Sequence, residues 1–183
     1  MLDLTGKVAL VTGAGSVGPG WSNGKATAVL LARQGAKVFL VDINPEAVAE
    51  TQAIIEGEGN QCAATTCDMM DSASVKAMVE DCIARFGRID ILVNNVGGSE
   101  PGDAVTQSEE AFDRQMDFNL KTAFLGCKYV IPHMENPGKG HACRVQLLQS
   151  GRHPVFTFDR RCLCPQKHSL QHRYSRPDAH AAG

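Results

Sequence analysis

The sequence contains no run of the roughly 20 apolar residues that a membrane-spanning helix requires. Its first residues also lack the basic and apolar regions of a secretory signal. The net charge of −2 gives no excess positive charge for a nucleic acid. Its seven cysteines lack the spacing of a disulfide framework. We therefore expect a cytoplasmic protein with reduced thiols and with neither a membrane nor a nucleic-acid partner.

The composition changes near Gly140. Residues 1–140 carry 11 basic and 18 acidic side chains, a net charge of −7, whereas residues 141–183 carry 7 and 2, a net charge of +5. Five of the six histidines follow Gly140, and no isoleucine or methionine does. A chain of 183 residues that is 43% apolar is long enough for one buried core. We predict one folded domain over residues 1–140 and an atypical, poorly ordered tail over residues 141–183.

Short β-rich runs alternate with amphipathic helices before this change in composition. The predicted strands are Lys7–Val11, Lys37–Asp42, Ala63–Cys67 and Ile89–Asn94. Such alternation predicts an α/β fold, a Rossmann-like doubly wound parallel sheet with helices on both faces. We expect this sheet to be incomplete at its C-terminal end.

Three helix predictions follow from spacing and capping residues. Apolar residues three and four positions apart predict a helix from about Ser72 to Phe86, which Gly87 ends. Another helix is expected to begin at Pro45, because proline is tolerated in the first turn and the preceding asparagine can cap it. A long helix is predicted over about Glu109–His133, bent near Pro132.

A glycine-rich loop lies between the first strand and the next predicted helix. Residues 12–24 read T-G-A-G-S-V-G-P-G-W-S-N-G, ahead of a helix with Ala26, Val29 and Leu30. Glycines let the backbone approach a pyrophosphate, and the helix N-terminus offers N–H groups to its charge. A simple tight turn is the alternative interpretation.

Asp42 ends the second strand about twenty residues beyond this loop, where a carboxylate accepts hydrogen bonds from the ribose of NAD. The same carboxylate would repel the 2′-phosphate of NADP, so the sequence predicts NAD, with NADP less favoured. Lys25 or Arg33 could favour NADP if the loop folds differently. The alternative for Asp42 is a solvated loop residue or a helix cap.

These motifs, together with Cys67-Asp68-Met69 and Asn94-Asn95-Val96-Gly97, resemble the short-chain dehydrogenase/reductase family over about residues 4–140. The resemblance implies an NAD(P)-dependent oxidoreductase that transfers hydride between nicotinamide and an alcohol or carbonyl substrate. It also implies a homo-oligomer for an intact relative, paired through the long helix. Because half of that pairing surface is missing here, we do not extend this expectation to the present chain.

The resemblance also implies roles for individual residues. Asn119 corresponds to the catalytic asparagine, and the implied cofactor-binding residues are Gly13, Gly15, Ser16, Gly24, Asp42, Asp68, Met69, Asn95, Val96 and Gly97. Asp68 and Met69 would border the adenine. An insertion, Val17–Trp21, interrupts the usual glycine pattern, so the family's last glycine is aligned with Gly24. Which of Gly15, Gly18 and Gly20 touch phosphate stays open.

The family's tyrosine and lysine pair, spaced Tyr-x-x-x-Lys, does not occur. Tyr129 is followed four residues later by His133, and Tyr174 by Asp178. A one-base shift of reading frame after about His141 permits the family's serine segment, which suggests a frameshifted tail. The chain is then expected to lack the catalytic serine and the Tyr–Lys pair. The alternative function is a non-catalytic dinucleotide-binding fragment or pseudoenzyme.

The tail also contains a cluster of metal-ligand types, Cys162, Cys164, His168 and His172. Thiolates and imidazoles suit zinc. The two pairs are much closer together than in structural zinc sites, however, so we predict no metal.

Overall fold

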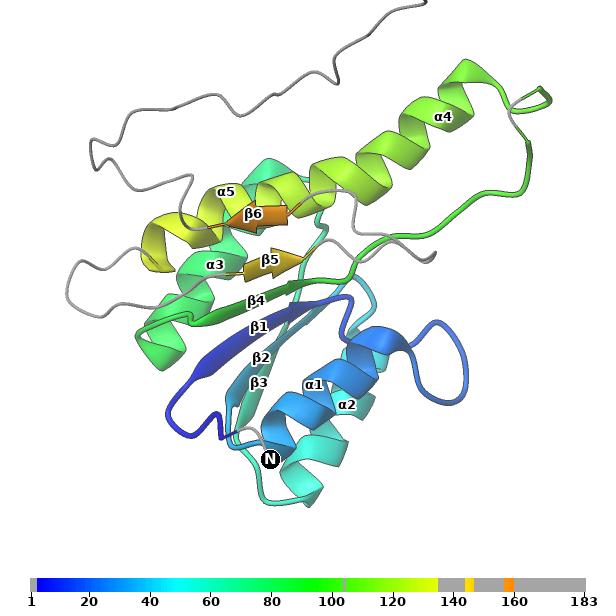
Figure 1. The fold of residues 1–183 in the computed structure, drawn as a ribbon. Coiled ribbons are helices and arrows are strands. Elements are labelled where there is room, and N and C mark those ends of the chain that lie inside the picture. The colour runs from blue at the N-terminus through cyan, green and yellow to red at the C-terminus, as the bar shows by residue number, and fades with distance from the viewer. Residues whose placement is uncertain (1–2, 104, 135–143, 147–156, 160–183) are drawn as a thin grey trace, which may run out of the picture.

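The computed structural model describes residues 3–103, 105–134, 144–146 and 157–159. Its centre is a parallel sheet of four strands in the order β3-β2-β1-β4 (Figure 1). The strands are β1 (Val8–Thr12), β2 (Lys37–Asp42), β3 (Cys62–Thr66) and β4 (Ile91–Asn94). The predicted Rossmann-like α/β fold is confirmed. β2 has the predicted ends, and the ends of the other three strands differ from the predicted ones by at most two residues.

Helices cover both faces of the sheet (Figure 1). On one face lie α1 (Asn23–Arg33) and α2 (Pro45–Gly57), which share a core with one set of strand side chains. On the other face lie α3 (Ser72–Phe86) and α5 (Thr122–Met134). Because both faces are covered, every residue of β1 is buried. This explains why β1 is an uninterrupted apolar run with one threonine at its end.

Capping residues fix where the helices begin and end. The Asn44 side chain accepts hydrogen bonds from the first turn of α2, with Pro45 at its first position. Asp71 caps the start of α3, and Gly87, with a φ of 74°, ends it in the left-handed conformation that favours glycine. Both predicted helices are confirmed. In α1, Leu30 is exposed rather than packed on the sheet.

The predicted helix over Glu109–His133 is helical throughout but not uniformly α-helical. It divides into α4 (Glu109–Met116), a π-helical segment η1 (Asp117–Lys121) and α5. A π turn accommodates one additional residue, and apolar spacing alone does not reveal such a shift. Pro132 lies inside α5.

Beyond α5 the structure describes two short strands, β5 (Arg144–Gln146) and β6 (Thr157–Asp159), which pair antiparallel to each other. In Figure 1 β5 lies beside β4, but the two belong to separate sheets. The other positions of the predicted tail, and the candidate zinc ligands, lie outside the described residues. Among the helices that are described, none is long and apolar enough to cross a membrane.

Candidate functional site

A cleft of about 530 Å³ opens at the carboxyl ends of the four parallel strands. Open parallel sheets bind their ligands at this edge, and the volume is in the range of small-molecule sites. Nine of the ten predicted cofactor-binding residues line the cleft, and so does Asn119. The nine are Gly13, Gly15, Ser16, Asp42, Asp68, Met69, Asn95, Val96 and Gly97.

Gly15 lies where the turn after β1 closely approaches the start of α2. Its backbone N–H donates to Asp42 Oδ2 at 2.8 Å. A Cβ placed on Gly15 would be 2.6 Å from the Cβ of Ala47 and 2.9 Å from Asp42 Oδ2. Only glycine fits there, so the backbone of the turn is held against the start of α2.

Gly24, the predicted cofactor residue outside the cleft lining, has a packing role. A Cβ on Gly24 would be 1.9 Å from the carbonyl oxygen of Gly13 and 2.5 Å from Asn95 Nδ2. Asn95 Nδ2 donates to that same carbonyl at 3.0 Å. Gly24 therefore lets α1 approach the end of β1, which is the purpose of the third glycine in dinucleotide-binding turns.

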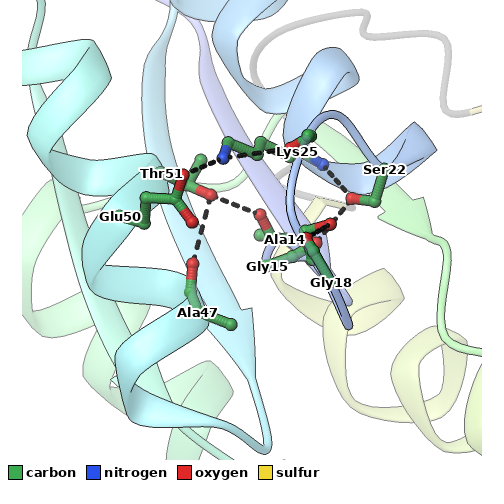
Figure 2. Close-up of polar contacts among 10 residues, drawn as sticks. Ala14, Gly15, Gly18, Ser22, Lys25, Ala47, Glu50 and Thr51 are labelled. Atoms are coloured by element: carbon green, nitrogen blue, oxygen red, sulfur yellow. Dashed lines mark hydrogen bonds and ion pairs between the residues drawn. The ribbon is translucent and has the colours of Figure 1, made fainter.

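The turn is tied to the first residues of α1 by Ser22 (Figure 2). Ser22 Oγ accepts a hydrogen bond from the backbone N–H of Lys25 at 3.0 Å and donates to the carbonyl of Gly15 at 2.5 Å. Thr51 of α2 adds a second tie, because its hydroxyl donates to the carbonyl of Ala14 at 2.8 Å. The N-terminus of α1 therefore faces the cleft with Ser22 and Asn23 in its lining, and such an end attracts anions.

Asp42 lies at the edge of the cleft with both carboxylate oxygens in use. Oδ2 accepts from Gly15, as described above, and Oδ1 accepts from the backbone N–H of Asn44 at 3.0 Å. These bonds fix the direction of the carboxylate while leaving lone pairs for further donors. Asp68 is held in a comparable way, since its Oδ1 accepts from the N–H of Met70 at 2.8 Å.

Apolar side chains form a wall of the cleft that the motifs did not single out. Ile43, Met70 and Phe118 line it while remaining 66%, 42% and 40% exposed. The Phe118 ring lies against Gly98, because a Cβ placed on Gly98 would be 3.1 Å from the ring. Ile43 could have been recognised because it directly follows Asp42. Phe118 could not, since its position depends on the π turn.

Asn119 uses its side chain to hold the loop that follows β4. Its Oδ1 accepts from the N–H of Gly98 at 3.0 Å, and its Nδ2 donates to the carbonyl of Gly98 at 2.8 Å and to that of Gln115 at 2.9 Å. A Cβ on Gly97 would be 2.7 Å from Asn119 Oδ1. The amide therefore fixes residues 97 and 98 beside the cleft.

Neither cation considered for a 2′-phosphate lies in the cleft lining. Lys25 is buried, with Nζ 2.6 Å from Glu50 Oε1. Arg33 pairs with Glu58 at 2.5 Å.

No tyrosine among the described residues lines the cleft. Tyr129 packs against the core on α5, and its hydroxyl lies 2.7 Å from Ser72 Oγ. The one cysteine in the cleft lining, Cys67, is buried, and burial followed by the charges of Asp68 and Asp71 raises its pKa to about 11. Its thiol therefore stays protonated and unreactive at neutral pH. Over the described ranges, no group of three or more potential ligands could hold a metal ion.

Comparison with known proteins gives a consistent assignment. The family model described as short chain dehydrogenase matches residues 7–153. An uncharacterized oxidoreductase from Thermotoga maritima is 37% identical over 162 residues, which are 88% of this chain and 60% of that protein. D-threitol dehydrogenase from Mycolicibacterium smegmatis is 39% identical over 137 residues, 75% of this chain and 51% of that enzyme.

A solved structure agrees with these matches. The crystal structure of a short-chain dehydrogenase/reductase from Burkholderia xenovorans is 50% identical, with a TM-score of 0.72 over 75% of this chain and 54% of that one. The present chain spans 60% of the length of the Thermotoga maritima oxidoreductase and 51% of the length of D-threitol dehydrogenase.

Proposed function

The chain belongs to the short-chain dehydrogenase/reductase family, and we propose that its cleft binds NAD in preference to NADP. The family uses nicotinamide cofactors, so the open question is which of the two fits. The observation that carries the proposal is Asp42, whose carboxylate is fixed at the edge of the cleft by two backbone N–H groups. It can accept hydrogen bonds from ribose hydroxyls, and it would repel a 2′-phosphate. The two cations considered for a 2′-phosphate, Lys25 and Arg33, are both paired with glutamates outside the cleft.

The other cleft residues take their proposed roles from their places along the sheet edge. The pyrophosphate would lie against the turn formed by Gly13, Gly15 and Ser16, where the N-terminus of α1 supplies positive potential. The adenine would lie beside Asp68 and Met69, against the apolar wall of Ile43, Met70 and Phe118. The nicotinamide path would follow Asn95, Val96 and Gly97, with Asn119 holding the backbone beyond it.

Bound NAD would supply the hydride chemistry, with an alcohol or carbonyl compound as the substrate. One of the relatives, D-threitol dehydrogenase, is named for a polyol substrate. This supports an alcohol or carbonyl compound as the substrate class here, without indicating a particular compound for this chain. For an intact relative we propose a cytoplasmic homo-oligomer, paired through the long helix. The exposed Phe112 and Phe124 on α4 and α5 suit such a contact.

Binding without catalysis is the second candidate function for this chain. Its supporting observation is that no Tyr-x-x-x-Lys occurs in the sequence. General acid–base help contributes roughly 10²–10⁴-fold to the rate, so we expect turnover lower by at least that factor than in a relative with the pair. Turnover of an alcohol or ketone panel at a relative's rate would exclude this second candidate.

Titration of the full chain with NADH and NADPH, followed by dihydronicotinamide fluorescence, tests the cofactor proposal. We expect wild-type protein to bind NADH at least about fivefold more tightly than NADPH, because a like charge close to the 2′-phosphate costs on the order of 1 kcal/mol or more. Asp42→Asn should reduce this preference to near unity, since the charge is lost while the amide oxygen can still accept from one of the two backbone N–H groups, that of Gly15 or that of Asn44. Asp81→Asn, an equal charge change on α3, is the control and should leave the preference unchanged. Equal or tighter binding of NADPH by wild type would refute the proposal.

A further inference from the structure

Lys25 is a buried cation whose contacts all lead toward the inserted loop Val17–Trp21 or toward α2. The residue is 2% exposed, and its Nζ donates to Glu50 Oε1 at 2.6 Å and to the carbonyl of Gly20 at 3.3 Å. The ring of Trp21 lies 5.6 Å from the same nitrogen. Figure 2 shows the side chain of Lys25 reaching from the start of α1 to Glu50.

This place is unfavourable for a lysine on grounds of stability alone. Lysines are almost never fully buried unless they are paired. A cation in the first turn also opposes the helix dipole, and the first turn of α1 has no acidic residue to offset it. The partner, Glu50, is itself 60% exposed at its side chain. The pair is therefore explained better by what it holds in place than by its contribution to folding.

What it holds is the inserted loop. Val17–Trp21 is exposed along its length, and Val17 projects fully into solvent. Both ends of the loop border the cleft, because Ser16, Val17 and Ser22 line it. Ser16 Oγ donates to the carbonyl of Gly18 at 2.8 Å and holds the first half of the loop. Lys25 holds the second half through Gly20 and connects it to α2.

We propose that Lys25 is a positioning residue, which with Glu50 fixes the inserted loop so that its two ends form the pyrophosphate end of the cleft. The inference rests on the proposed binding of NAD. Lys25 does not line the cleft, so it acts through the loop and does not touch phosphate. Fixing one backbone residue costs entropy equivalent to roughly a tenfold change in affinity, and a loop ordered in advance avoids that cost when the cofactor binds.

The two partners of the pair distinguish positioning from simple charge attraction. If the ammonium attracted the pyrophosphate directly, removing the opposing charge of Glu50 would strengthen cofactor binding. If the pair holds the loop, the same change weakens binding. The sign of the effect of Glu50→Gln therefore decides between the two roles.

The experiment compares NADH affinity in wild type, Lys25→Met, Glu50→Gln and the control Arg33→Met. Arg33 and Glu58 also join α1 to α2, but at the far end of both helices from the loop. Trp21 is the only tryptophan in the chain, so its quenching by acrylamide reports the exposure of the loop directly. We expect Lys25→Met and Glu50→Gln each to weaken NADH binding about tenfold and to increase the quenching of Trp21, while Arg33→Met changes neither.

Tighter NADH binding by Glu50→Gln would overturn the proposal, as would an equal loss in Arg33→Met. If wild type binds NADH, and Lys25→Met and Glu50→Gln both leave NADH affinity and Trp21 quenching unchanged, the positioning role of Lys25 is refuted while the proposed cofactor binding stands. Failure of wild type to bind either NADH or NADPH would refute the proposed function, and the positioning role with it. If Lys25→Met does not fold, Glu50→Gln carries the test, because its side chain is mostly exposed and the change removes no atoms of the packing.

Discussion

Replacing Gly24 with alanine tests the central geometric feature of the cleft, the close approach of α1 to the end of β1. The added Cβ would lie 1.9 Å from the carbonyl oxygen of Gly13 and 2.8 Å from its carbonyl carbon. Ordinary van der Waals contact begins near 3.4 Å, so the two backbones would have to separate by about 1.5 Å. Gly13 lies in the turn directly after β1 and Gly24 in the first turn of α1, and these backbone atoms cannot move aside as the end of a flexible side chain can.

The expected cost follows from two opposing effects. Overpacking of this kind costs typically about 1–3 kcal/mol. Alanine regains up to about 1 kcal/mol in a helix interior, but Gly24 lies in the first turn, where the gain is smaller. We therefore expect the free energy of unfolding to fall by about 2 kcal/mol. NADH binding should weaken as well, because the shift moves the start of α1 away from the turn.

Urea denaturation and NADH titration of the variant measure the two effects. The matched control is Gly57→Ala in α2, where an added Cβ meets nothing within 4 Å. Because Gly57 is the last residue of α2, that variant should be stabilised by at most about 0.5–1 kcal/mol and should bind NADH as wild type does. If Gly24→Ala were as stable as Gly57→Ala and bound NADH equally well, the close approach would not exist as described.

Three further outcomes can be measured. Burial raises the pKa of Asp90, but the Arg88 guanidinium and other donors outweigh burial and lower this pKa below the ordinary 3.8. The stability that the Asp90 carboxylate contributes is therefore present above pH 3.8 and is lost as the pH falls through the lowered pKa. Asp90→Asn should thus reduce stability at pH 7 and flatten the acid side of the stability curve, whereas an unchanged curve would refute the assignment. Burial raises the pKa of the Cys82 thiol to about 12. Iodoacetamide labelling of Cys82 at pH 8, resolved by peptide, should therefore be slow in native protein and fast in urea, whereas fast labelling of native protein would contradict the burial. Asn119→Ala leaves the backbone of Gly98 without its partner and should lower the free energy of unfolding by about 1–3 kcal/mol in urea titration, with no change counting against the role described for the amide.

The local patterns predicted the sheet, the glycine-rich turn and Asp42, whereas the other cleft residues that were predicted came from the resemblance to the short-chain dehydrogenase/reductase family. Continuous apolar runs marked the buried strands, and Asn44-Pro45 and Gly87 marked helix ends. Because parallel strands present their carboxyl ends along one edge, residues that directly follow strands had to lie together. This geometry accounts for Asp42 and Asp68, the second of which only the resemblance had assigned to the site, lying in one cleft.

The features that were not predicted depend on contacts between distant segments. Apolar spacing did not predict the π turn of η1, where Phe118 lines the cleft and Asn119 contacts Gly98, on a loop 21 residues earlier. Gly24 was assigned to cofactor binding with the other glycines, yet only its close approach to Gly13 in the folded chain reveals its packing role. The partner of Lys25 is on a different helix, 25 positions along the chain, and no local pattern relates the two.

An oxidoreductase of this family needs both a site that binds the cofactor and a group that transfers a proton, and in this chain the two can be considered separately. Every residue proposed to contact the cofactor ends or follows one of the four strands or lies in η1, so the cofactor-binding part depends on packing within residues 3–134. Proton transfer requires a tyrosine whose pKa a nearby lysine lowers, and the two tyrosines of the sequence are followed at that spacing by His133 and Asp178. Binding energy for the cofactor does not by itself accelerate the chemical step, since only interactions stronger in the transition state do so. The affinity for NADH therefore tests the proposed cofactor binding, and the rate of turnover tests the second candidate function, binding without catalysis.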